Sequence, residues 1–175
     1  MFDTINGIPV HPLVVHAVVV LLPLTIAGAF AIVFRPDWRE RYGVLVVLTS
    51  GLATLAIPIA TSSGEALERQ VGNPGEHAAL GDQLIWFALP LFALLVVYVG
   101  MHRLARSSDQ SGGARGASLG RLAGGRVSTL VAGLTLVAAG ASGVQVYRVG
   151  DSGARAAWGQ ASHGASAPAG QVPGR

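Results

Sequence analysis

The sequence of 175 residues contains no cysteine and no lysine. Without cysteine, the chain cannot form disulfide bonds, thiolate metal sites, cysteine-ligated iron–sulfur clusters or c-type haem attachments. Charge is also scarce, because only 12% of the residues are charged and the formal net charge is +3. All 12 basic residues are arginines. So small a positive excess gives no support for nucleic-acid binding, and we expect no nucleic-acid partner.

Apolar residues, by contrast, make up 51% of the chain and occur in long blocks. About 20 consecutive apolar residues are enough to cross the hydrocarbon core of a bilayer. Four segments approach or exceed that length, and we expect spans at approximately 12–34, 42–61, 80–102 and 127–149. The sequence therefore predicts an all-α fold, an integral membrane four-helix bundle, whose four-span membrane domain covers residues 7–150.

Two segments have little apolar surface to bury. Residues 107–125 are mostly Gly, Ser, Ala and Arg, and residues 151–175 are rich in Gly, Ala, Ser and Pro. We expect a disordered inner loop and a disordered C-terminal tail there. The first apolar block is longer than the apolar region of a secretory signal peptide, so we expect it to be retained.

The arginines indicate how the spans are oriented. The connection after the second span carries mostly acidic residues, whereas those after the first and third spans are basic. Positive charge in short loops stays on the cytoplasmic side. We therefore expect a multi-pass protein of the cell membrane with both termini outside the cytoplasm. The basic positions are Arg35, Arg39, Arg41, Arg103, Arg106, Arg115, Arg121 and Arg126, and the acidic ones are Glu65, Glu68, Glu76 and Asp82.

His16 lies about one turn inside the first apolar run. An ionisable side chain inside a membrane span is unfavourable by roughly a few kcal/mol, which favours a functional role for it. Val20, Pro23 and Ala27 share its helical face, and we expect this stripe to face the bundle. His11 is five positions earlier, about 140 degrees around the helix, so we expect it to lie at the helix entrance instead.

His77 follows a Pro and a Gly that favour a helix start, with Asn73 as the expected cap. On a helical wheel the third span places His77 on one stripe with His102, and the last span has a similar stripe that we expect to face inward. The stripe of the third span is His77, Leu84, Leu91, Leu95 and His102; that of the last span is Gly133, Val137, Gly140, Val144 and Tyr147.

Histidines and carboxylates from separate segments are thus expected at the outer face. Imidazole and carboxylate suit a transition metal, and His11, His16, Glu65 and His77 are the candidate ligands. Alternatively, His16 and His77 could hold haem b axially. Helix depth places His11 level with His77, which favours a shallow metal site that also uses Glu65. The remaining alternative involves no metal or haem: the carboxylates belong to a solvated loop, and the histidines only cap it and form hydrogen bonds with it.

Through four motifs in order, the chain from Gly7 to Trp158 resembles bacterial membrane proteins catalogued as domain of unknown function 2231. The resemblance implies a compact four-helix membrane domain. Relatives can be joined to iron–sulfur domains, which implies redox partners; we expect no such domain in this chain, and the resemblance implies no activity. The motifs are Gly7-Ile8-Pro9-Val10-His11-Pro12-Leu13-Val14-Val15-His16, the segment 61–68 with Gly64 and Glu65, Glu76-His77, and Val146-Tyr147-Arg148-Val149-Gly150.

Two functions remain open at this point: a haem- or metal-binding redox component of the membrane with a redox partner, and a structural or accessory subunit of a membrane complex without a cofactor. A small transporter or proton pathway is disfavoured because no acidic residue falls at mid-membrane. No nucleophile with a neighbouring base can be named, so the sequence assigns no catalytic residue.

Overall fold

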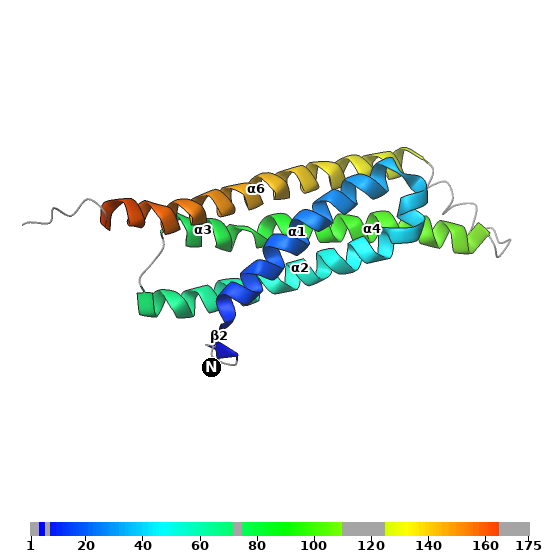
Figure 1. Cartoon of the computed structure of the whole chain (residues 1–175). Coiled ribbons are helices and arrows are strands. Elements are labelled where there is room, and N and C mark those ends of the chain that lie inside the picture. Colours follow the sequence, from blue (N-terminus) through cyan, green and yellow to red (C-terminus); the bar gives the residue numbers. More distant parts are fainter. Residues whose placement is uncertain (1–3, 6–7, 72–74, 110–124, 165–175) are drawn as a thin grey trace, which may run out of the picture.

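The computed structural model describes residues 4–5, 8–71, 75–109 and 125–164. Within them the chain forms five helices, which run alongside one another in an elongated bundle (Figure 1). Two short strands, β1 (Thr4–Ile5) and β2 (Ile8–Pro9), pair antiparallel before the first helix. The helices are α1 (Val10–Phe34), α2 (Pro36–Val71), α3 (Glu76–Gln83), α4 (Ile85–Asp109) and α6 (Arg126–Gly164).

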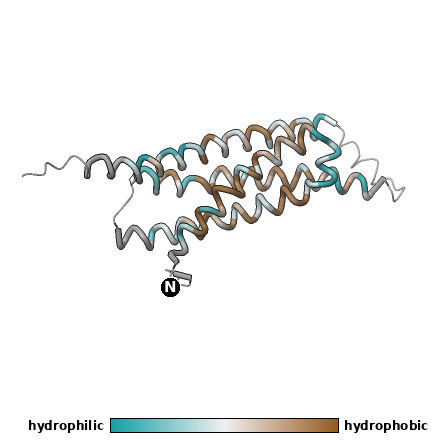
Figure 2. The backbone as a smooth tube through the Cα atoms, viewed as in Figure 1, coloured by the Kyte–Doolittle hydropathy of each residue, from teal (hydrophilic) through white to brown (hydrophobic). Residues whose placement is uncertain are grey.

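Four helical segments are long and apolar enough to cross a membrane, with α3 and α4 together forming the third. Figure 2 shows hydrophobic residues along the middle of the helices and hydrophilic residues at the turn from α1 to α2. The predicted all-α, four-span architecture is confirmed. The spans are His11–Phe34, Pro36–Ala66, Glu76–Ser107 and Arg126–Arg155.

The C-terminal tail differs in part from the expected disorder. Helix α6 continues to Gly164, so residues 151–164 are helical. Several alanines there favour helix, and extending an existing helix requires no new nucleation. The rest of the expected disordered segments, residues 110–124 and 165–175, lie outside the described residues.

Helices α1 and α2 are joined through Arg35 alone. Its carbonyl oxygen accepts the backbone N–H groups of Trp38 and Arg39 at 3.0 and 3.1 Å. Pro36 occupies the first helical position of α2, where its missing N–H costs nothing, and Asp37 complements the helix dipole. The two helices therefore form a tight hairpin. We call this end of the bundle, where α4 also ends, the arginine end, and the opposite end, where α1 and α3 begin, the histidine end.

The third span is interrupted where α3 meets α4. The Leu84 N–H bonds to the carbonyl of Gly81, three residues back, at 3.1 Å. The carbonyl of Leu80, four residues back, accepts the side-chain amide of Gln145 on α6 at 3.0 Å. At the start of α3, Gly75 with a φ of 65° is the cap and makes no side-chain cap bond. The expected cap, Asn73, lies outside the described residues.

The face that α1 turns inward is not the predicted one. The predicted stripe of His16, Val20, Pro23 and Ala27 is exposed, so that expectation is wrong. The buried positions of α1 follow a different stripe, which includes the polar Thr25. These positions are Val18, Leu22, Thr25, Ala29 and Ile32.

Helix α6 shows the same reversal. The predicted inward stripe of α6 is exposed, with Val137 at 70% and Tyr147 at 73%. In the third span, for which the sequence predicted a stripe but no inward face, Leu84, Leu91 and Leu95 are buried. The buried face of α6 is instead lined by small and polar residues, namely Thr135, Ala139, Ser142, Gln145 and Ser152.

Candidate functional site

The histidine end contains a cavity of about 780 Å³, within the typical range for ligand pockets. We call it the histidine pocket, because His11 from α1 and His77 from α3 both line it. Helices α2 and α6 complete the walls, so both helical hairpins contribute. The walls are mainly apolar and include Val15, Val18, Ile57, Ala60, Leu84 and Val146.

His11 reaches from the first turn of α1 to helix α2. Its Nδ1 lies 3.0 Å from the carbonyl oxygen of Ala60 and 3.2 Å from the hydroxyl of Ser63. That hydroxyl donates to the same carbonyl at 2.9 Å. The ring also packs against Gly64, where an added Cβ would lie only 3.1 Å from Cε1 of His11. The absence of a side chain at Gly64 therefore makes room for the imidazole.

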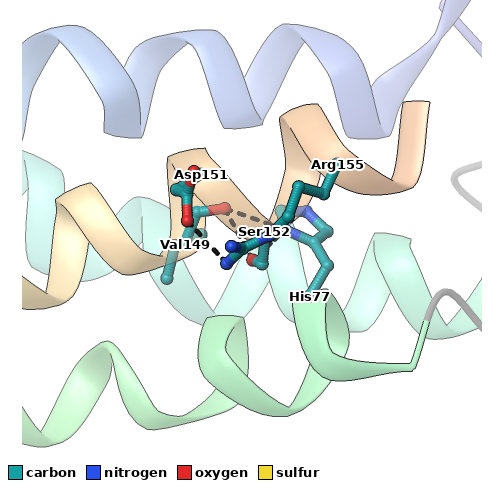
Figure 3. Close-up of polar contacts among 5 residues, drawn as sticks. All are labelled: His77, Val149, Asp151, Ser152 and Arg155. Carbon is teal, nitrogen blue, oxygen red and sulfur yellow. Dashed lines mark hydrogen bonds and ion pairs between the residues drawn. The ribbon is translucent and has the colours of Figure 1, made fainter. Parts of the chain in front are cut away.

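His77 reaches from the first turn of α3 to helix α6 (Figure 3). Its Nδ1 lies 3.1 Å from the carbonyl oxygen of Val149 and 3.3 Å from the hydroxyl of Ser152. A Cβ added at Gly153 would lie 3.0 Å from Cε1 of His77. Next to these contacts, Asp151 and Arg155 form an ion pair on the surface of α6.

These contacts determine which ring nitrogen of each histidine carries the proton. A carbonyl oxygen can only accept a hydrogen bond, so Nδ1 of His11 and of His77 must be the donor. In a neutral imidazole, Nε2 is then unprotonated and presents a lone pair. Neither Nε2 has a hydrogen-bond partner among the residues that the structure describes. Metal-ligating histidines have this arrangement, with one nitrogen on the metal and the other donating to a carbonyl.

His16 does not line the histidine pocket. Its side chain is exposed, and its Nδ1 bonds to the carbonyl of Pro12 on its own helix. The reason is angular: His16 lies about 140 degrees around α1 from His11, which faces α2. The structure therefore brings together His11, Glu65 and His77 at the pocket and leaves His16 outside its lining.

The acidic residues are distributed around the same end. Glu65 and Asp82 line the pocket, and both are exposed. Glu76 is exposed but does not line the pocket, and the side chain of Glu68 is outside the described part of the chain. Across the described residues, no three or more His, Asp or Glu side chains form a group that could hold a metal ion.

Sequence reasoning missed the residues that hold the two imidazoles. Ser63, Ser152 and Gly153 were not singled out, although the Ser-Gly pair occurs in both helices that face the histidines. Gln145 was missed too, and its only signal was an amide side chain inside an apolar block. His102 lies at the arginine end, half-buried between α4 and α6. Its Nε2 lies 3.2 Å from the hydroxyl of Ser128.

A comparison with known families covers the residues of the histidine pocket. The family model described as "Predicted membrane protein (DUF2231)" matches residues 7–165. That range includes both histidines of the pocket and both Ser-Gly pairs. No curated protein matches the sequence, and no solved structure matches it. Because the match covers far more than half of its length, the chain belongs to the DUF2231 family of predicted membrane proteins.

Proposed function

We propose that the protein is a membrane redox component that binds a transition-metal group, haem b or a metal ion, in the histidine pocket. The observation that carries this proposal is the state of the two imidazoles. His11 and His77 each donate Nδ1–H to a backbone carbonyl, which leaves each Nε2 as a lone-pair donor at one pocket. Imidazole in this tautomer is a common ligand of haem iron, zinc and copper.

The rest of the pocket supports a bulky cofactor. Its walls are mainly apolar, its volume is about 780 Å³, and small residues line part of it. Such a space suits an organic macrocycle better than a small hydrated ion. Haem iron also needs no further protein ligand beyond its axial ones, which fits the two available imidazoles. His11 and His77 would hold the haem, whereas the sequence had proposed His16 with His77.

The orientation of the site follows from charge. Arg35, Arg39, Arg41, Arg103 and Arg106 lie at the arginine end, which the positive-inside rule assigns to the cytoplasm. Both termini and the histidine pocket then face the non-cytoplasmic side. A redox partner would approach the cofactor from that side.

The test is the optical spectrum and metal content of the protein purified in detergent, before and after addition of haemin. We expect a Soret band and about one haem per chain. His11→Ala or His77→Ala should remove the six-coordinate spectrum. His16→Ala is the matched control, because it removes a histidine of the same helix that does not line the pocket, and should leave the spectrum unchanged. Absence of a Soret band, of haemin uptake and of stoichiometric metal would overturn the proposal.

A second candidate is an accessory subunit without cofactor. The observation that favours it is the exposed face of α6, where Gly133 and Gly140 flank Val137. Small residues on a membrane helix let another helix approach closely. Co-purification with a larger complex, unchanged in His11→Ala and His77→Ala and without any bound cofactor, would support this candidate instead.

A further inference from the structure

The two histidines of the pocket are held by the same arrangement on two different helices. On α2 the acceptor carbonyl belongs to Ala60, and on α6 it belongs to Val149. In each helix a serine follows three positions later and a glycine four positions later. We call these the two Ser-Gly units: Ala60, Ser63 and Gly64 with His11, and Val149, Ser152 and Gly153 with His77.

The distances in the two units agree closely. From the histidine Nδ1, the carbonyl oxygen is 3.0 Å away in one unit and 3.1 Å in the other. The serine hydroxyl is 3.2 and 3.3 Å away, respectively. Each hydroxyl donates to the same carbonyl at 2.9 Å. The glycine Cβ position lies 3.1 Å from one ring and 3.0 Å from the other.

The two units also occupy equivalent places in the fold. Each histidine is the second residue of the helix that opens a span, α1 or α3. Each Ser-Gly pair lies on the helix that returns to the histidine end, α2 or α6. Each opening span also has a proline in the interior of its long helix, Pro23 or Pro90. The bundle is therefore built from two similar helical hairpins, and each contributes one imidazole to the shared pocket.

We propose that the two Ser-Gly units are equivalent positioning devices that hold His11 and His77 as the two residues that would bind one haem iron. This inference rests on the proposed function and narrows it from any transition-metal group to haem. Two identical nitrogen donors, without a third His, Asp or Glu in a group with them among the described residues, suit a centre whose remaining ligands belong to the cofactor.

Each part of a unit has a separate physical role. The carbonyl fixes the Nδ1–H tautomer and so leaves the lone pair of the neutral ring on Nε2. The serine oxygen accepts from Nδ1 while its proton is held by the carbonyl, which fixes the orientation of the ring. The glycine lets the ring lie against the helix, because a methyl group at Gly64 or Gly153 would force the imidazole to move by a few tenths of an ångström.

The first experiment measures haemin affinity of the full-length protein in detergent. We expect Ser63→Ala and Ser152→Ala to weaken affinity by a similar factor, roughly 10- to 100-fold, the usual effect of losing an outer-shell partner. Gly64→Ala and Gly153→Ala should do the same or more. Ser62→Ala and Gly140→Ala are the matched controls: the Ser62 hydroxyl bonds to the Pro58 carbonyl within α2, and Gly140 has open space around it.

The second experiment determines the tautomers of the histidines by ¹⁵N NMR on protein without haem. Both His11 and His77 should carry the proton on Nδ1. An Nε2–H tautomer in either ring, or a serine effect confined to one unit, would overturn the equivalence. Failure of the wild-type protein to take up haemin would instead overturn the haem assignment, and the proposed function falls with it only if no stoichiometric metal binds either. The positioning of the rings is then judged by the NMR result alone.

Discussion

Gln145 donates a hydrogen bond of 3.0 Å from its side-chain amide to the carbonyl oxygen of Leu80. This contact joins α6 to the last turn of α3, where the regular helical bond to that carbonyl is replaced by one from Leu84 to Gly81. The side chain of Gln145 is 1% exposed. The bond therefore ties the short helix that carries His77 to the helix that anchors its imidazole.

Replacing Gln145 with Leu should loosen α3. The change leaves the Leu80 carbonyl without its side-chain donor, which costs about 1 to 2 kcal/mol in stability. We expect a lower thermal midpoint in detergent and faster hydrogen exchange of the α3 amides. Val144→Ala, at an exposed neighbouring position, should change neither. Unaltered exchange in α3 of the Gln145→Leu variant would show that the bond does not hold this helix.

A methyl group at Gly28 should separate α1 from α2. An added Cβ there would lie 2.8 Å from Cγ2 of Val46, closer than van der Waals contact allows. Gly28→Ala should therefore destabilise the protein by about 1 to 3 kcal/mol, as overpacking does elsewhere. The measurement is the thermal midpoint of the detergent-solubilised protein.

Two further variants identify the cause of that effect. Gly133→Ala places a methyl group in open space and should leave the midpoint near that of the wild type. Val46→Ala combined with Gly28→Ala should recover part of the loss, because it removes the clashing methyl groups. If the double variant is no more stable than Gly28→Ala, the close approach of the two helices is not what limits stability.

Absence of cysteine makes the orientation easy to measure, because single introduced cysteines can be labelled without background. Ala154→Cys, exposed at the histidine end, should react with a membrane-impermeant maleimide in intact cells. Ser107→Cys, exposed at the arginine end, should react only after the membrane is opened. The reverse pattern would place the arginine end outside and contradict the positive-inside assignment.

The sequence predicted the number and position of the spans because the bilayer sets a minimum length for an apolar helix. It also predicted that Leu84, Leu91 and Leu95 share one stripe of the third span, and the structure buries all three. It predicted that His11 lies at the entrance of the first helix, at the same depth as His77, and both residues line one pocket. These features depend on length and on position along the chain.

The sides of α1 and α6 that face the bundle interior were predicted wrongly, for a physical reason. Lipid and the bundle interior are both apolar, so a stripe of Val and Leu does not reveal which side it faces. In this protein small polar residues mark the inner face of both helices. Thr25 and Thr135, both fully buried, bond to carbonyls one turn back in their own helices. Taking Thr25 and Thr135 as markers of the inner face would have predicted the correct sides of both helices and an exposed His16.

The amino-acid sequence by itself thus determined a four-span membrane protein with histidines at the start of two spans, because hydropathy and helix length are local properties. Only the tertiary structure decided that His11, and not His16, shares a pocket with His77. It also decided that Ser63 and Ser152 hold the two rings, since contacts 52 and 75 residues apart depend on how the two hairpins pack.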